Sequence, residues 1–304
     1  MNKQKMKGNF LLLITAFVWG VSFISQSKGV ETISPCAFNG IRSVLGGLVL
    51  LPVIAVTDII RKRKGIEVQK LNKKLVAGGI ICGVLLCAAS TVQTAGMVYT
   101  SPGKAGFITA LYMIIVPIIG LLTGKRPRPA ILLAVLIATA GLYLMCINSK
   151  LTINKGDVMV LVCAFLFAGH ILAIDYFSPR VDGVKLACLQ FFVCGIINLI
   201  WVLLFENPQL EPILGCSIAI GYSGIMSCGV AYTLQIVGQK YTDPTSASIL
   251  MSLESVFAVL ATVVLVACGW ELTGGALTAR EITGCVLMFA AIILVQLPET
   301  NDKK

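Results

Sequence analysis

Glu254 and His170 are the residues of this sequence with the most distinctive chemistry, because each is an ionisable side chain within a long apolar run. Glu254 lies in the run 245–267, and His170, the only histidine, lies in the run 157–176. Ionisable residues deep in an apolar span are costly and usually functional, and histidine titrates near neutral pH. Both residues are therefore candidates for proton coupling, and Glu254 also for binding a cationic solute.

Each of these residues also has a structural interpretation. Glu254 can hydrogen-bond hydroxyls such as those of Ser252 and Ser255, and His170 can sit in a cavity wall without any coupling role. Arg42, in the run 36–57, is expected to be a structural charge. It can pair with a carboxylate, or its long side chain can reach the membrane interface, because it lies within about two turns of the start of its run.

Polar and aromatic side chains within other runs are candidates for binding a solute. Glutamines at helical spacing from small polar residues mark cavity faces, although small polar residues also serve close helix packing. Tyrosine rings can stack on aromatic or cationic solutes, whereas a tyrosine near the end of a run, such as Tyr99, can be an interface anchor. The candidate binding residues are Trp19, Gln93, Tyr99, Tyr112, His170, Tyr222, Tyr232, Gln235 and Glu254.

The elements that must position these residues are membrane-spanning helices. Charged residues make up 12% of the 304 residues, about half of the ~25% found in soluble globular proteins, and mean hydropathy is +0.91. These values exclude a soluble domain and a disordered chain, and they indicate an all-α polytopic membrane protein. Ten runs approach the ~20 apolar residues that a spanning helix needs: 8–26, 36–57, 75–98, 104–123, 129–147, 157–176, 186–205, 213–237, 245–267 and 281–297.

Basic residues between the runs predict the orientation. If both termini are cytoplasmic, 18 of the 24 Lys and Arg residues fall on the cytoplasmic side and five on the other, as the preference of basic residues for cytoplasmic loops requires. The net charge of +10 is thus a signal of topology in the cytoplasmic membrane. It indicates contact with lipid and no nucleic-acid partner.

Motifs for enzymatic chemistry are missing from the sequence. Phosphate-binding glycine loops, zinc-protease motifs and nucleophile elbows do not occur, so we expect no enzyme and no cofactor. The 11 cysteines lie mostly within apolar runs and form no CxxC pair, so they are expected to pack as small apolar residues and not to bind a metal.

An internal repeat divides the chain into two halves of five helices. Residues 93–117 align without gaps on 235–259 at an offset of 142, and the first helices align more weakly at an offset of 148. The first alignment pairs Gln93 with Gln235 and Tyr112 with Glu254. An odd number of helices in each half predicts an inverted-topology repeat, which many secondary transporters use for alternating access.

These motifs resemble the EamA-type branch of the drug/metabolite transporter superfamily. The resemblance is carried by AFVWGVSF in the first run, NGIRSVLGGLVLLP in the second, the Q..G..YT.P..A block and its copy, and SLESVFAVL in the ninth run. It implies two EamA-like repeats, 8–147 and 157–297, around a central cavity, with transport of small solutes that is often efflux. The family's frequent proline after the glutamate is Ser255 here.

The sequence therefore predicts a secondary transporter that moves a small metabolite or drug-like solute by alternating access, as an exporter. Proton coupling through Glu254 or His170 is a hypothesis within this prediction. An uncoupled facilitator and a non-transporting membrane protein, either a scaffold or a lipid-modifying enzyme, remain as alternatives. The sequence does not specify the oligomeric state.

Overall fold

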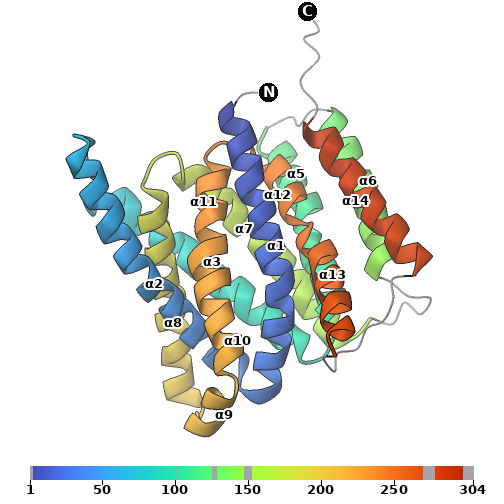
Figure 1. Cartoon of the computed structure of the whole chain (residues 1–304), viewed down its shortest axis with the longest axis horizontal. Helices are drawn as coiled ribbons and strands as arrows, with labels where there is room; N and C mark the ends of the chain where they lie inside the picture. The colour runs from blue at the N-terminus through green and yellow to red at the C-terminus, as the bar shows by residue number, and fades with distance from the viewer. Residues whose placement is uncertain (1–2, 101, 125–128, 147–152, 270–277, 297–304) are drawn as a thin grey trace, which may run out of the picture.

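The structure is a computed structural model that describes residues 3–100, 102–124, 129–146, 153–269 and 278–296. All regular elements in these ranges are helices (Figure 1). They are α1 (Lys3–Thr32), α2 (Pro35–Arg63), α3 (Lys73–Met97), α4 (Pro102–Ala110), α5 (Tyr112–Leu122), α6 (Pro129–Cys146), α7 (Lys155–Phe177), α8 (Gly183–Phe205), α9 (Leu210–Gly215), α10 (Ser217–Tyr222), the π-helix η1 (Ser223–Tyr232), α11 (Thr233–Gln239), α12 (Pro244–Met251), α13 (Glu254–Ala267) and α14 (Ala279–Gln296).

The described helices confirm the prediction of an all-helical membrane protein. Eight helical segments are long and apolar enough to cross a membrane, and two shorter apolar helices lie within α6 and α14. These two helices pack closely, because a Cβ atom added at Gly141 would lie 2.7 Å from the carbonyl oxygen of Gly284. The predicted ends at residues 147 and 297 lie outside the described ranges.

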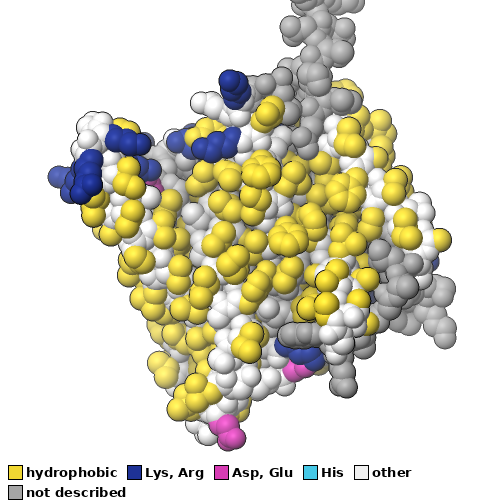
Figure 2. Space-filling model, viewed as in Figure 1, with side chains coloured by type: hydrophobic (Ala, Val, Ile, Leu, Met, Phe, Trp, Pro, Cys, Tyr) yellow, Lys and Arg dark blue, Asp and Glu magenta, His cyan; other side chains and the backbone are white. Residues whose placement is uncertain are grey.

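The face of the bundle that Figure 2 shows is apolar along most of its length. Leucines and isoleucines on several helices, among them Leu122, Leu203 and Ile218, are largely exposed. Apolar patches of this extent are rare on soluble proteins, but they are what a bilayer of hydrocarbon chains requires. Lys and Arg side chains on the visible face gather mainly at the end where α1 begins and α2 ends (Figure 2).

Helix ends are fixed by local sequence. Ser34 accepts a hydrogen bond from the backbone N–H of Ala37 and is followed by Pro35 at the first position of α2, a combination that favours helix starts. Asn154 and Asp157 form a reciprocal capping box at the start of α7.

Two of the spans are interrupted at equivalent positions. The fourth predicted run divides into α4 and α5 at Leu111, and the ninth divides into α12 and α13 at Leu253. Leu111 and Leu253 are aligned at the offset of 142, and both have φ −59° and ψ −13°. The backbone N–H of each leucine bonds the carbonyl three residues earlier, the tighter 3₁₀ pattern that often marks a hinge.

The two halves also pack against each other reciprocally, through α2 and α8. An added Cβ at Gly47 would lie 3.1 Å from the Phe192 ring, and one at Gly195 would lie 2.7 Å from the Val44 side chain. At the offset of 148, Gly47 corresponds to Gly195 and Val44 to Phe192. The packing is therefore consistent with two structural repeats.

Candidate functional site

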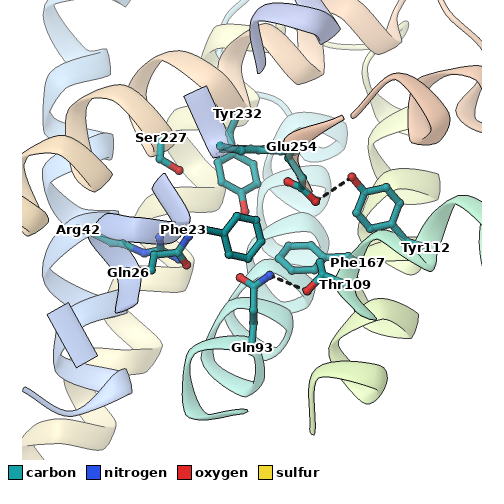
Figure 3. A pocket seen from close by; sticks show the side chains of 11 residues that line it. Phe23, Gln26, Arg42, Gln93, Thr109, Tyr112, Phe167, Ser227, Tyr232 and Glu254 are labelled. Atoms are coloured by element: carbon teal, nitrogen blue, oxygen red, sulfur yellow. Dashed lines mark hydrogen bonds between the residues drawn. The ribbon is translucent and has the colours of Figure 1, made fainter. Parts of the chain in front are cut away.

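A cavity lies at the centre of the bundle, between the two interrupted spans and α1, α2, α3, α7 and η1 (Figure 3). It offers about 30 Å³ to the centre of a water molecule, which is room for one or two waters. Its wall combines two charged residues with amides, hydroxyls and aromatic rings: Trp19, Phe23, Gln26, Arg42, Gln93, Thr109, Tyr112, Phe167, Ser227, Tyr232 and Glu254.

Glu254 lies in this wall at the first position of α13, directly after the break in its span. The residue is only 4% exposed. Tyr112, the first residue of α5, donates a hydrogen bond of 3.0 Å from its hydroxyl to Glu254 Oε1. The helix breaks thus bring two equivalent residues of the two halves into direct contact, and the amino-terminal end of α13 provides partial positive charge beside the carboxylate.

A second polar pair joins α3 to α4 in the wall. Gln93 donates a hydrogen bond of 3.0 Å from Nε2 to Thr109 Oγ1 (Figure 3). Thr109 was not among the residues predicted from sequence, although it lies just before the break at Leu111. The break arises from packing between helices, so no local sequence signal marks Thr109.

Aromatic rings form the rest of the wall. The rings of Trp19 and Tyr232 lie 4.5 Å apart between centroids, and Figure 3 shows Phe23 and Tyr232 between Arg42 and Glu254. Phe167, which aligns with Trp19 at the offset of 148, lines the cavity from the other half. An aromatic wall suits the apolar or ring-shaped part of a solute.

The π-helix η1 explains how Ser227 and Tyr232 reach the same cavity. In an α-helix, residues five apart point about 140° away from each other. The wider turn of a π-helix brings residues five apart closer to the same direction than an α-helix does, and such segments are frequent at functional sites. No local sequence signal predicts this segment, which is why Ser227 is absent from the predicted residues.

Arg42 also belongs to the cavity wall and is 3% exposed. This position differs from the expected structural charge at the membrane interface, because the guanidinium is buried among helices. Its carbon lies 5.4 Å from the centre of the Phe38 ring. Within the described ranges Arg42 takes part in no ion pair, and its Nε atom has no hydrogen-bond partner.

Five of the nine predicted binding residues line the cavity and four do not. The five are Trp19, Gln93, Tyr112, Tyr232 and Glu254. Tyr99 is 53% exposed and contacts the ammonium of Lys155, the first residue of α7, as an interface residue does.

The other predicted residues are buried or partly buried behind the wall. His170 Nε2 lies 3.1 Å from Gln190 Oε1. The imidazole contacts the rings of Phe167 and Tyr232, which line the cavity, but does not line the cavity itself. Tyr222 donates a hydrogen bond of 3.2 Å from its hydroxyl to the Val18 carbonyl. Gln235 is buried, and its Oε1 has no partner.

Two equivalent contacts lie at opposite ends of the bundle. In the first clamp, formed by Gly8, Asn9 and Thr242, the Thr242 hydroxyl donates a hydrogen bond of 2.9 Å to Asn9 Oδ1. In the second clamp, formed by Thr100, Gly156 and Asp157, the Thr100 hydroxyl donates a hydrogen bond of 2.7 Å to Asp157 Oδ1. α1 and α7, which carry Asn9 and Asp157, begin at opposite ends (Figure 1).

The clamps correspond residue by residue. Asn9 aligns with Asp157 at the offset of 148, and Thr100 aligns with Thr242 at 142. They differ in charge, because Lys104 Nζ lies 2.5 Å from Asp157 Oδ2 in the second clamp, whereas the first clamp has the neutral Asn9. No group of three His, Cys, Asp or Glu side chains within the described ranges is arranged to hold a metal ion.

Comparison with known families agrees with this architecture. The profile of the EamA-like transporter family matches residues 6–147 and, separately, residues 154–297. The chain belongs to the EamA-like transporter family. Both matched units contribute residues to the wall of the central cavity. This EamA-like transporter therefore has both halves in one polypeptide.

Relatives of this EamA-like transporter carry the same general description. An "Uncharacterized transporter" of Archaeoglobus fulgidus is 29% identical over 97% of this chain and 87% of its own length. "Uncharacterized transporter YwfM" of Bacillus subtilis is 26% identical over 82% of each chain. A solved crystal structure aligns with a TM-score of 0.72 at 20% identity, over 95% of this chain and 96% of the other, and shares the fold.

Proposed function

We propose that this EamA-like transporter is a secondary transporter that exports a small solute across the cytoplasmic membrane by alternating access. The observation that carries the proposal is the pair of equivalent clamps at opposite ends of a cavity with polar and aromatic walls. Inverted repeats permit two similar packings, each open to one side of the membrane. Both clamps are formed, and all residues that line the cavity are buried except Phe167, which is partly buried, as an intermediate between these two packings requires.

The proposed orientation places the first clamp on the cytoplasmic side. α2 ends in Arg61, Lys62 and Arg63 at the end of the bundle where α1 begins, and basic residues favour the cytoplasmic side. The second clamp then faces the exterior. Export is the direction that the resemblance to the superfamily implies.

Proton coupling is proposed for Glu254. A carboxyl group in a membrane interior is costly in its charged form and gains or loses a proton as its surroundings change. Opening either clamp changes the access of water to Glu254. His170 remains the second coupling candidate, but its imidazole does not line the cavity and already contacts Gln190.

The test is transport by the purified protein in proteoliposomes, from a mixed pool of metabolites, with and without a pH gradient. We expect accumulation of at least one solute that increases with the gradient, and loss of this increase in Glu254→Gln. His170→Gln is the matched control, because it also replaces an ionisable side chain by an amide, but outside the cavity.

Each alternative predicts a different result. Transport that is indifferent to the gradient in the wild-type protein supports an uncoupled facilitator. Gradient-driven transport that survives in Glu254→Gln and is lost in His170→Gln assigns coupling to His170. No accumulation of any solute contradicts the transport mechanism itself and favours a scaffold or another non-transporting protein.

A further inference from the structure

We propose that Arg42 is the anion-binding residue of the central cavity and that the transported solute carries a carboxylate group. This inference rests on the proposed transport function. It assigns a chemical class to the solute and a binding role to a residue whose sequence position alone indicates a structural one.

Arg42 has no counter-ion from the described protein. It is 3% exposed, takes part in no described ion pair, and leaves Nε without a hydrogen-bond partner. A buried charge without a partner is costly, and a guanidinium always carries its proton in proteins. The Phe38 ring 5.4 Å away compensates only a small part of this cost. An anionic group inside the cavity would supply the missing partner.

Glu254 does not neutralise Arg42. Figure 3 shows the two side chains on opposite sides of the cavity, with Phe23 and Tyr232 between them. Glu254 is instead hydrogen-bonded to Tyr112 on its own side. The cavity wall therefore has a guanidinium on one side and a carboxyl group on the other, and the guanidinium lines the cavity without an ion-pair partner in the described ranges.

The residue at the equivalent position of the second half has a structural role. Gln190 corresponds to Arg42 at the offset of 148, and its Oε1 lies 3.1 Å from His170 Nε2. Gln190 thus has a protein partner at Oε1, although its Nε2 has none, and the residue does not line the cavity. Arg42 lines the cavity and forms no described ion pair, as expected of a residue that binds a ligand, whereas Gln190 bonds another side chain, as expected of a residue that supports packing.

The chemistry of the wall selects a carboxylate. Arginine matches the planar carboxylate group with two parallel hydrogen bonds, and a second unpartnered donor, Trp19 Nε1, lies in the same wall. One cation balances one negative charge, whereas a phosphate dianion leaves an uncompensated charge. The aromatic rings suit the apolar remainder of such a molecule.

Thermal unfolding of the purified protein in detergent tests the inference with four matched probes. Butyrate carries a carboxylate, 4-aminobutyrate carries a carboxylate and an ammonium, butyramide is neutral, and n-butylamine carries only an ammonium. We expect stabilisation by butyrate, with or without a larger effect of 4-aminobutyrate, and none by butyramide or n-butylamine. Equal concentrations of sodium chloride control for ionic strength.

Substitutions of Arg42 test the residue. Arg42→Gln removes a buried charge that has no protein partner, so we expect a folded protein whose melting temperature without probe does not fall. Its apparent affinity for butyrate should be at least tenfold weaker. Arg42→Lys keeps the charge without the planar fork and should retain part of the affinity. Lys28→Gln removes an exposed cation and should bind butyrate like the wild type.

The inference is overturned by stabilisation that does not depend on the carboxylate, by absence of stabilisation with both carboxylate probes, or by unchanged butyrate affinity in Arg42→Gln. If Arg42→Gln does not fold, weaker butyrate binding in a folded Arg42→Lys supports the inference, and wild-type affinity in that variant contradicts it. The binding measurement in detergent does not require transport. A protein that binds butyrate through Arg42 but transports no solute would therefore contradict the proposed function and not the anion-binding role of Arg42.

Discussion

Tyr112 and Glu254 occupy the same position in the two halves of the chain, and the Tyr112 hydroxyl donates a 3.0 Å hydrogen bond to the Glu254 carboxylate. Two equivalent residues can touch only close to the axis that relates the halves. Each is also the first residue after the break in its span. A movement of one half against the other would therefore change this hydrogen bond. The surroundings of Glu254 thus depend on how the two halves pack against each other.

Removing the Tyr112 hydroxyl should impair transport without unfolding the protein. We expect Tyr112→Phe to lower the rate at saturating solute several-fold and to cost about 1–3 kcal/mol of stability, the range for a lost hydrogen bond to a buried acceptor. Transport in proteoliposomes and thermal unfolding measure the two effects. Tyr99→Phe is the control, because Tyr99 is exposed outside the cavity, and it should change neither. Equal rates for Tyr112→Phe and the wild type would contradict a role for the pair.

A methyl group at Gly8 should open the first clamp selectively. An added Cβ there would lie 2.7 Å from Thr242 Oγ1 and 2.8 Å from the Gly238 carbonyl oxygen, so Gly8→Ala forces α1 away from α11. Hydrogen–deuterium exchange should rise at residues 238–243 and stay unchanged at residues 97–100. A rise at both ends would indicate general loosening of the bundle and count against separate gates.

The equivalent substitution at Gly156 should have the opposite pattern. An added Cβ would lie 2.5 Å from the Gly96 carbonyl oxygen and 2.9 Å from the Tyr99 Cβ. Gly156→Ala should therefore increase exchange at residues 97–100 and leave residues 238–243 protected. The two variants serve as controls for each other, because each adds one methyl group to the start of an equivalent helix.

At low ionic strength, the ion pair between Asp157 and Lys104 should make the second clamp more stable than the first. Asp157→Asn keeps the side-chain shape and removes the charge that faces Lys104 at 2.5 Å. We expect roughly tenfold faster exchange at residues 97–100, equivalent to about 1.4 kcal/mol, and less difference from the wild type at high salt. Lys28→Gln disrupts an exposed pair, with side chains 49% and 57% exposed, and should have no measurable effect. Salt-independent exchange in the wild type would exclude the ion pair as the cause.

Asp182 should make stability depend on pH at the end of the bundle where α8 begins. Burial raises the pKa of this carboxyl, but hydrogen bonds from Arg61 and the Lys185 backbone, with the charges of Arg61 and Lys185, outweigh burial and lower the pKa below its usual value. A lowered pKa contributes stability above the usual pKa of aspartate, about 3.9, and this stability is lost as pH falls through the folded-state pKa. Asp182→Asn still caps α8 but lacks this charge.

The measurement is thermal unfolding in detergent from pH 7 down to about pH 3. Wild-type protein should lose more stability than Asp182→Asn over the acidic part of this range. The two melting temperatures should converge at the lowest pH. Parallel curves for the two proteins would show that Arg61 does not stabilise the charged form of Asp182.

The sequence by itself determined the class of protein, the ten apolar segments, the two related halves and the placement of Glu254 within a span. These features are local, because a spanning helix satisfies its backbone hydrogen bonds within itself and requires only a sufficient length of apolar residues. The gap-free block of residues 93–117 and 235–259 also showed which positions are equivalent.

The tertiary structure decided which side of each helix faces the cavity. Spanning helices are apolar nearly all round, so their sequence has little periodicity to mark an inner face. For this reason Arg42, predicted as a structural charge, lies in the cavity wall, whereas Tyr222, His170, Gln235 and Tyr99, which also had an interpretation as an interface anchor, lie outside the wall. The breaks at Leu111 and Leu253 and the π-helix η1 likewise arise from packing between helices, because no local residue type requires them.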